Sequence, residues 1–311
     1  FNNLGALLQA KGDFAAAEPL LHEALEVQRE TLGNRHPQTL NSINNLGALL
    51  KAKGDLTAAE LLYREALEGK RETLGNRHLS TLGTVSNLGM LLRAKGNLAA
   101  AEPLLREALK ALRETLGIRH PQTLGCINNL GALLMDKDDL TASEPLLREA
   151  LEVSREMLGN RHQCTLVFTN NLGKLLRAKG DLAGAEPLSR EALEGQRDTL
   201  GDRHPDTLIS INNLGKLLMV KGDLTAAEPL LREALEGQCQ TLGNRHLSTL
   251  TSISGLGQLL MAKGDLSAAE PLLREALEGR RETLGDQHPK TLAAIKRLGV
   301  LAAGKGRPRR R

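Results

Sequence analysis

The chain has 311 residues, a length that would suit about two ordinary globular domains. It contains no Trp, one Tyr and three Phe, so Leu and Ala must fill its core, as they do in stacked helices. The formal net charge is +4, and four arginines at the C-terminal end account for all of it: Arg307, Arg309, Arg310 and Arg311. The rest of the chain is neutral, which argues against a basic domain that binds nucleic acid.

A Leu-Gly dipeptide returns every 42 residues from one end of the chain to the other. Its glycines are Gly5, Gly47, Gly89, Gly131, Gly173, Gly215, Gly257 and Gly299. A fixed period between about 20 and 50 residues is typical of solenoid proteins. The sequence begins at Phe1, in the middle of the repeated motif, so we expect it to be part of a longer protein.

Each repeat is predicted to contain two helices, which we call helix A and helix B. In the second repeat, helix A is expected over Gln38–Ala52 and helix B over Thr57–Thr73. Between them, Gly54 suits a helix C-cap, and Asp55 or Thr57 can start the next helix. No alternating strand pattern competes with this interpretation, so the fold is predicted to be all-α.

Two repeats depart from the shared pattern. Asp138 stands where the other repeats have the Gly of the "KGDL" turn, and Ser189 replaces a leucine of helix B. If the turn needs a positive φ, Asp tolerates it less well than Gly. The smaller Ser189 side chain should loosen the packing of its helix.

The spacing of small residues resembles that of the tetratricopeptide repeat. Counting from Gly47, Ala59 lies twelve residues further on and Ala66 nineteen, with Leu46 and Leu50 beside the glycine. The usual period of that repeat is about 34 residues. The longer period and the motif "NNLG…KGDL…AEPLL.EAL…R.TLG..HP.T" are similar to the repeats of kinesin light chains and their relatives.

This resemblance covers residues 1–303, which are predicted to form one tetratricopeptide-like array. It implies a right-handed superhelical solenoid of antiparallel helix pairs, with about seven repeats and a terminal half repeat. The remaining residues, 304–311, form a basic tail that we expect to be disordered.

One side of helix A is polar in the second repeat. On a helix with about 100° per residue, Asn41, Asn44, Ala48 and Lys51 fall on one side, opposite the apolar residues. We call these four positions, with their equivalents in the other repeats, the helix-A stripe. No Asp or Glu occupies the stripe in any repeat, although helix B is rich in Glu. By resemblance to tetratricopeptide arrays, the stripe is expected to line a concave groove.

Amide side chains can pair with a peptide backbone, and Lys or Arg favours acidic side chains or a C-terminal carboxylate. The stripe therefore predicts a peptide-binding surface, although a solvated face that is merely polar and mildly basic would look similar. The candidate binding residues are Asn44, Lys51, Arg93, Asn128, Asn170, Lys174, Arg177, Asn212 and Lys216.

The recurring histidines do not predict a metal or catalytic site. One His opens each repeat, so the histidines should spread along one edge instead of converging on one ion. They are His36, His78, His120, His162, His204, His246 and His288. We expect each to order the loop before helix A. No phosphate-binding glycine motif occurs in a strand–helix context, so neither enzyme activity nor a cofactor is predicted.

Cysteine usage and hydropathy indicate the cellular setting. The three cysteines, Cys126, Cys164 and Cys239, form no disulfide framework, which favours a reducing compartment such as the cytoplasm. No apolar run approaches the roughly 18 residues of a membrane span.

These observations predict a non-catalytic interaction scaffold or adaptor that binds an extended acidic peptide or a C-terminal segment in its groove. An alternative is that the repeats are the sensor or autoinhibitory region of a larger signalling ATPase or protease. Binding of RNA is a third possibility, against which the neutral repeats and the scarcity of aromatic residues argue.

Overall fold

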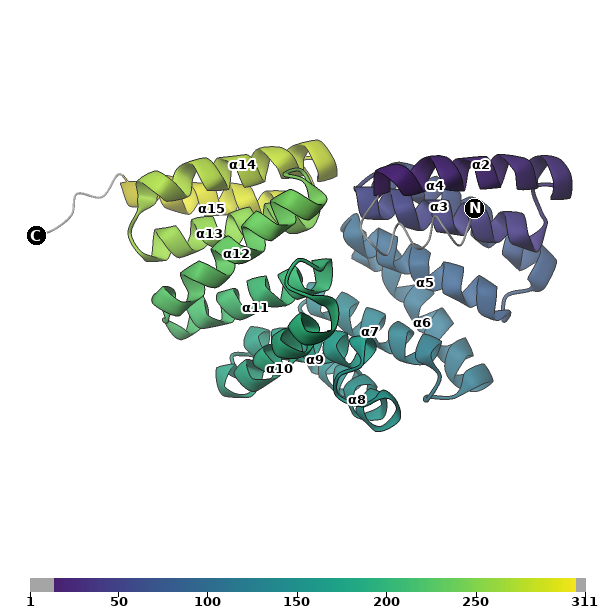
Figure 1. Ribbon diagram of the computed structural model, residues 1–311, viewed down its shortest axis with the longest axis horizontal. Coiled ribbons are helices and arrows are strands. Elements are labelled where there is room, and N and C mark those ends of the chain that lie inside the picture. Colours follow the sequence, from purple (N-terminus) through teal and green to yellow (C-terminus); the bar gives the residue numbers. More distant parts are fainter. Residues whose placement is uncertain (1–13, 306–311) are drawn as a thin grey trace, which may run out of the picture. The chain divides into compact units, whose positions relative to one another are not determined.

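The computed structural model describes residues 14–305, which form fourteen helices, α2 to α15, joined by short turns (Figure 1). The described part of the chain contains no strand, so the predicted all-α repeat architecture is confirmed. None of its helices is both long and apolar enough to cross a membrane. The first Leu-Gly motif and the tail from residue 306 onward lie outside the described residues.

The chain divides into two compact units at Val153 and Ser154, a boundary that lies within α8 (Leu140–Leu158). The first unit contains α2 (Phe14–Leu32), α3 (Pro37–Lys53), α4 (Leu56–Leu74), α5 (Leu79–Ala94), α6 (Leu98–Leu116) and α7 (Pro121–Asp136). The second contains α9 (Gln163–Lys179), α10 (Leu182–Leu200), α11 (Pro205–Lys221), α12 (Leu224–Leu242), α13 (Leu247–Ala262), α14 (Leu266–Leu284) and α15 (Pro289–Lys305).

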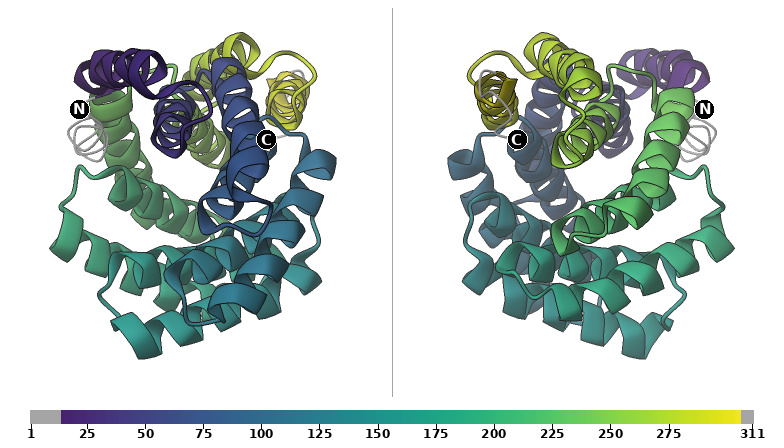
Figure 2. Two further views of the ribbon diagram at one scale, coloured as in Figure 1. Left: turned by 90° about the vertical axis from the view of Figure 1, so that its right-hand side faces the viewer. Right: turned by 90° about the vertical axis from the view of Figure 1, so that its left-hand side faces the viewer.

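Within each unit, successive helices lie side by side and run in opposite directions (Figures 1 and 2). The odd-numbered helices from α3 to α15 correspond to the predicted helix A and the even-numbered ones to helix B. Consecutive A helices also contact each other: α3 contacts α5, α5 contacts α7, α9 contacts α11 and α11 contacts α13. The side chains of neighbouring repeats therefore meet directly along the row of A helices.

Histidines and glycines set the helix ends. His36 precedes α3, and its Nδ1 atom accepts a hydrogen bond from the Gln38 N–H at 3.2 Å, which satisfies one of the free amides of the first turn. The same cap recurs at His78, His120, His162, His204 and His246. The expected ordering of this loop by histidine is thus confirmed. At the other turn, Gly54 ends α3 with a φ of 95°, and Asp55 caps α4 through the Ala58 N–H.

The turn at Asp138 has the positive φ that the sequence pattern suggested. Its φ is 64°, and among the described residues it is the one non-glycine residue with a positive φ. Asp therefore occupies a left-handed conformation that glycine adopts in the equivalent turns.

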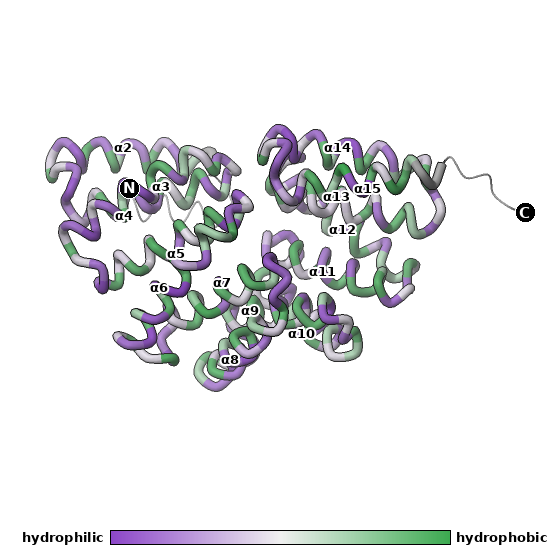
Figure 3. The backbone as a smooth tube through the Cα atoms, turned by 180° about the vertical axis from the view of Figure 1, so that it is seen from behind, coloured by the Kyte–Doolittle hydropathy of each residue, from purple (hydrophilic) through white to green (hydrophobic). Residues whose placement is uncertain are grey.

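A close contact between a helix-B side chain and a helix-A glycine joins the two helices of each pair. A methyl group added at Gly131 would lie 2.7 Å from Leu147 Cδ2, so only glycine fits at this position. Leu105, Leu231 and Leu273 make the same contact in their repeats, and Tyr63 does so in the second repeat. Figure 3 shows that apolar and polar residues alternate along the helices.

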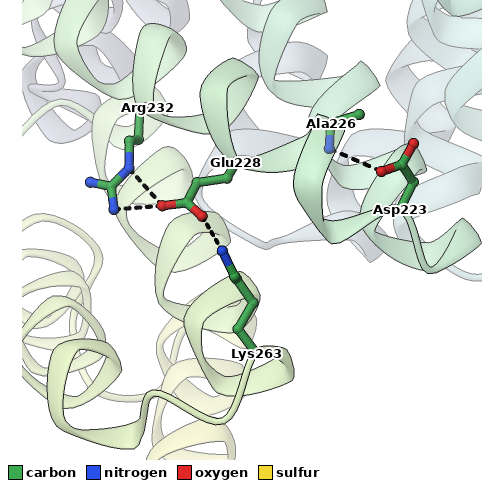
Figure 4. Close-up of polar contacts among 5 residues, drawn as sticks. All are labelled: Asp223, Ala226, Glu228, Arg232 and Lys263. Atoms are coloured by element: carbon green, nitrogen blue, oxygen red, sulfur yellow. Dashed lines mark hydrogen bonds and ion pairs between the residues drawn. The ribbon is translucent and has the colours of Figure 1, made fainter.

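Ion pairs connect each repeat to the next on the helix-B side. Glu228 of α12 accepts hydrogen bonds from Arg232, one turn further along the same helix, and from Lys263 at the end of α13 (Figure 4). These two bonds hold the pKa of the Glu228 carboxyl below its usual range. The same arrangement recurs around Glu60, Glu102 and Glu186. Each pair is partly exposed and stabilises little by itself, but the network ties consecutive repeats together.

A second row of ion pairs joins consecutive B helices. An arginine near the end of one helix B pairs with a glutamate 36 residues later. The pairs are Arg29–Glu65, Arg71–Glu107, Arg113–Glu149, Arg155–Glu191 and Arg197–Glu233. Cys239 occupies the arginine position of the next repeat and faces Glu275, whose charge adds to the effect of burial in raising the pKa of the thiol. The row is therefore interrupted between α12 and α14.

Ser189 is buried at the position where other repeats place a leucine against the helix-A glycine, here Gly173. We predict that Ser189→Leu raises the free energy of unfolding by about 1–2 kcal/mol, because the leucine buries apolar surface that serine leaves unfilled. Thermal or urea unfolding would measure the change. Leu231→Ser, at the same position one repeat later, should lower stability by at least as much. A destabilised Ser189→Leu variant would mean that the space around Ser189 has closed.

Lys70 is a buried charged side chain on α4. It is 2% exposed, and its Nζ donates to Thr84 Oγ1 at 3.0 Å. No carboxylate among the described residues pairs with it, and burial lowers the pKa of its amine to about 8. In the preceding repeat, Gln28 occupies the equivalent position and hydrogen-bonds to Ser42.

We predict that Lys70→Gln stabilises the protein at pH 7 by on the order of 2 kcal/mol, because the uncharged amide avoids the desolvation of an ammonium group. The folded-state pKa lies below the unfolded value, so between about pH 8 and 10.5 the unfolded state binds more protons. The difference in the free energy of unfolding between the variant and the unmodified chain should therefore shrink as the pH rises through this window. Unfolding at several pH values would measure both effects. A stability difference that is constant across the window would contradict the prediction. The reverse substitution at the equivalent position, Gln28→Lys, should lower the free energy of unfolding at pH 7.

Candidate functional site

The predicted binding residues lie in both units, and the structure places all nine at least partly inside the packed array. Asn44, Lys51, Arg93 and Asn128 belong to the first unit. Asn170, Lys174, Arg177, Asn212 and Lys216 belong to the second. Asn128, Asn170 and Asn212 are only 8%, 7% and 5% exposed, respectively. The remaining six side chains are half-buried.

The asparagines tie consecutive A helices to each other. Asn87 Nδ2 of α5 donates to Asn44 Oδ1 of α3 at 3.2 Å, and Asn213 of α11 donates to Asn170 of α9 at the same distance. We call this contact the asparagine clamp. Asn129 reaches back one repeat in the same way, to Ser86, which stands where other repeats have the first asparagine. At least part of the amide row therefore serves to stack the repeats.

In the first unit, one of the two stripe cations, Arg93, pairs with a carboxylate. The Arg93 guanidinium lies 2.7 Å from the Asp136 carboxylate, which α7 contributes from just beyond the stripe. Lys51 lies near Arg93, and burial together with the positive charge of Arg93 lowers the pKa of its amine. The sequence pattern did not reveal Asp136 as a partner, because this residue lies one position outside the four that define the stripe.

In the second unit, Lys174 and Arg177 lie close enough to Lys216 to act on its charge. Burial and the charges of Arg177 and Lys174 lower the pKa of the Lys216 amine to about 7. Burial also lowers the pKa of Arg177. Among the residues that the structure describes, no carboxylate lies within the 4.0 Å of an ion pair from Arg177 or Lys216. The residue of α11 equivalent to Asp136 is Val220.

Two further arginines belong to this group of cations and were not among the predicted residues. Arg280 of α14 and Arg297 of α15 both contribute to the electrostatic field that lowers the pKa of Lys216. Arg280 is 4% exposed and donates to two backbone carbonyls, those of Leu250 and Lys290. Arg297 stands one repeat after Gly255, at a position where most repeats have the clamp asparagine, so a departure from the repeat pattern could have identified it.

Metal binding finds no support in the described part of the chain, where no group of three His, Cys, Asp or Glu residues could hold an ion. The histidines are used as helix caps, one in each repeat. What the stripe of the second unit offers instead is a set of cations together with amide hydrogen-bonding groups.

The family comparison identifies the same repeat that the arrangement of helices indicates. The model of the tetratricopeptide repeat family matches residues 1–72, 79–156, 124–198, 165–240, 206–282 and 248–310. The chain belongs to the tetratricopeptide repeat family. Proteins built from this repeat are generally scaffolds for protein–protein interaction and typically have no catalytic activity.

Solved structures of kinesin-light-chain type are similar to the chain. One is a point variant of a putative kinesin light chain of Podosopora anserina with nearly identical repeats, at 25% identity over 65% of this chain and 95% of that one, with a TM-score of 0.51. Another is BtubC (BKLC) of P. vanneervenii, at 25% identity over 74% and 91% of the two chains, with a TM-score of 0.55. The predicted resemblance to kinesin light chains is thereby confirmed.

A Rap protein solved in complex with competence and sporulation factor shares the fold alone. It is 12% identical, covers 97% of each chain and has a TM-score of 0.61. A comparison with curated proteins found no match.

We predict that the two asparagines at 212 and 213 differ in their effect on stability. Asn213→Ala should lower the free energy of unfolding by about 1–2 kcal/mol, because it removes a clamp donor and leaves Asn170 Oδ1 without that partner. Asn212→Ala should change it by less than about 0.5 kcal/mol, since Asn212 Oδ1 accepts no hydrogen bond among the described residues. Urea unfolding of both variants tests this, and equal losses would contradict a structural role for the clamp.

Proposed function

We propose that this chain is a non-catalytic interaction scaffold that binds an extended acidic peptide segment along the helix-A stripe. The observation that carries this proposal is the gathering of Arg177, Lys216 and Arg297 in the second unit without a carboxylate partner among the described residues. Half-buried cations without partners lose hydration, so a ligand that supplies negative charge stabilises them. The same ligand can use amide groups of the stripe for its backbone.

The repeats serve as an adaptor in this proposal, and the concave groove expected of tetratricopeptide arrays holds the peptide. The three cysteines are free, with Cys126 buried and Cys164 exposed, which supports a reducing compartment such as the cytoplasm. The alternative, a sensor or autoinhibitory region of a larger ATPase or protease, uses the same surface with the acidic segment supplied by the parent chain.

We predict that reversing the charges of Lys174, Arg177 and Lys216 to Glu weakens binding of an acid-rich peptide at least about tenfold, because three attractive charges become repulsive. The probe is a fluorescein-labelled eight-residue peptide of alternating Glu and Ala, and the measurement is fluorescence anisotropy near physiological ionic strength. A lysine-containing peptide of the same length tests the charge preference.

The matched control is a triple reversal of Arg190, Arg232 and Arg274, which lie on helix B. Among the described residues, each of them pairs with a glutamate one turn away and with no other carboxylate. It changes the net charge by the same amount, so it reports the effect of overall charge. The proposal is wrong if the two triple variants lose affinity equally, or if neither does. Combined Ala substitution of Asn128, Asn170 and Asn212 would show how much the amide row contributes to the affinity.

A further inference from the structure

A pair of residues lies at the boundary between consecutive repeats, one on helix B and one on the next helix A. The Thr39 hydroxyl of α3 donates to the Gln28 carbonyl of α2 at 3.4 Å. The same bond recurs at five later boundaries, through Thr81, Thr123, Thr165, Thr249 and Thr291. The residue three positions after the threonine lies on the same side of helix A, so it meets the helix-B residue. We call these two residues, 14 positions apart in the sequence, the seam pair.

Side-chain contacts and burial support this placement. Gln28 Oε1 accepts a hydrogen bond from Ser42 Oγ, and Lys70 Nζ donates to Thr84 Oγ1 at 3.0 Å. By the 42-residue period, the other seam pairs are Leu112–Cys126, Ser154–Phe168, Gln196–Ser210, Gln238–Ser252 and Arg280–Ala294. Every residue of these five pairs is at most 4% exposed. The side chains of a seam pair therefore have to fit each other.

Each seam pair combines a long side chain with a short one. In six of the seven pairs between residues 14 and 305, helix B supplies the long residue, such as Leu112, and helix A the short one, such as Cys126. The pair of α8 and α9 is reversed, with Ser154 on helix B and Phe168 on helix A. Both residues belong to the second unit, and the bond from Thr165 to the Ser154 carbonyl places α9 against this serine. A long residue opposite a short one keeps the boundary filled although the side chains differ.

Polarity distinguishes the remaining seam pairs. Leu112–Cys126 is apolar, whereas the first two pairs are hydrogen-bonded. In Gln196–Ser210, by contrast, the amide oxygen and the hydroxyl have no hydrogen-bond partner among the described residues, and the same holds for the pair that follows it. Those two pairs therefore match in size but not in hydrogen bonding.

The reversed pair is incompatible with the seams of the other repeats. Ser154 would leave a cavity against the short residue of any other helix A, and Phe168 would overlap with the long residue of any other helix B. Elsewhere the repeats are nearly identical, so a helix A could stack on the wrong helix B, within the chain or in a second copy of it. The reversed pair disfavours such stacking at its own seam.

We infer that the seam pairs specify which repeats stack on each other, and that Ser154 with Phe168 fixes the order of the repeats where α8 meets α9. Size is the dominant criterion, because a mismatch leaves either a cavity or an overlap inside the array. The inference concerns the assembly of the array and does not depend on the proposed peptide binding.

The first test makes this seam equal to another seam of the chain. Ser154→Leu combined with Phe168→Cys copies the Leu112–Cys126 pair. We predict that each single substitution lowers the melting temperature of the full chain by at least about 4 °C, through crowding or a cavity. The double variant should recover at least about half of the summed loss. As a matched control, Phe168→Cys combined with Gln238→Leu, which belongs to a different seam, should show additive effects.

The order of stacking is measured separately, by refolding. The chain is unfolded in urea, refolded by dilution at high protein concentration and separated by size-exclusion chromatography. The double variant should form at least about threefold more dimer than the unmodified chain, because its α8–α9 seam then accepts helices from the α6–α7 seam of a second copy.

Phe168→Leu is the control for stability, since it keeps a long residue opposite Ser154. It should lower the melting temperature by a few degrees and leave dimer formation unchanged. The inference is overturned if the losses of the two single substitutions simply add, or if the double variant refolds with the dimer fraction of the unmodified chain. Equal dimer formation by Phe168→Leu and the double variant would also overturn it, because destabilisation alone would then account for the dimers.

Discussion

The array depends on how closely helix B can approach the glycine in the middle of its helix A. The contact of Leu147 with Gly131 leaves no room for a β-carbon, so it fixes the separation of the two backbones. Because nearly the same contact recurs every 42 residues, each helix pair has nearly the same shape. The repetition of caps and ion pairs follows, since groups at equivalent positions then meet at equivalent distances.

Two sets of polar contacts supplement this apolar packing. The Lys–Glu–Arg groups join repeats on the helix-B side, and the asparagine clamp joins consecutive A helices. Surface ion pairs contribute little singly, whereas a half-buried amide pair is more selective because an unpaired partner remains inside the protein. The clamp therefore explains why a poor helix former recurs in the middle of helix A.

The two units use the same framework with different charge compensation. In the first, Arg93 has Asp136 beside it, and the stripe is closer to neutral. In the second, Val220 leaves Arg177 without that partner, and Gly255 brings Lys216 next to an unpaired amide oxygen. A few substitutions within nearly identical repeats are thus enough to change the charge along the helix-A stripe.

The sequence by itself determined the fold class, the 42-residue period, the helix boundaries to within about a residue and the need for glycine at Gly47 and its equivalents. These follow from local periodicity and from steric limits that act within one repeat. It also indicated the stripe and its cations, which simple helical geometry places on one side. Only the tertiary structure decided what the stripe residues touch. That Asn213 reaches Asn170, that Asp136 neutralises Arg93 and that Lys216 lies against Gly255 depend on the offset between neighbouring helices. This offset arises from how two helix pairs pack together, and the pattern within a single helix does not contain it. For the same reason Arg280 and Arg297, which come from different helices, join the field around Lys216 only in the folded chain.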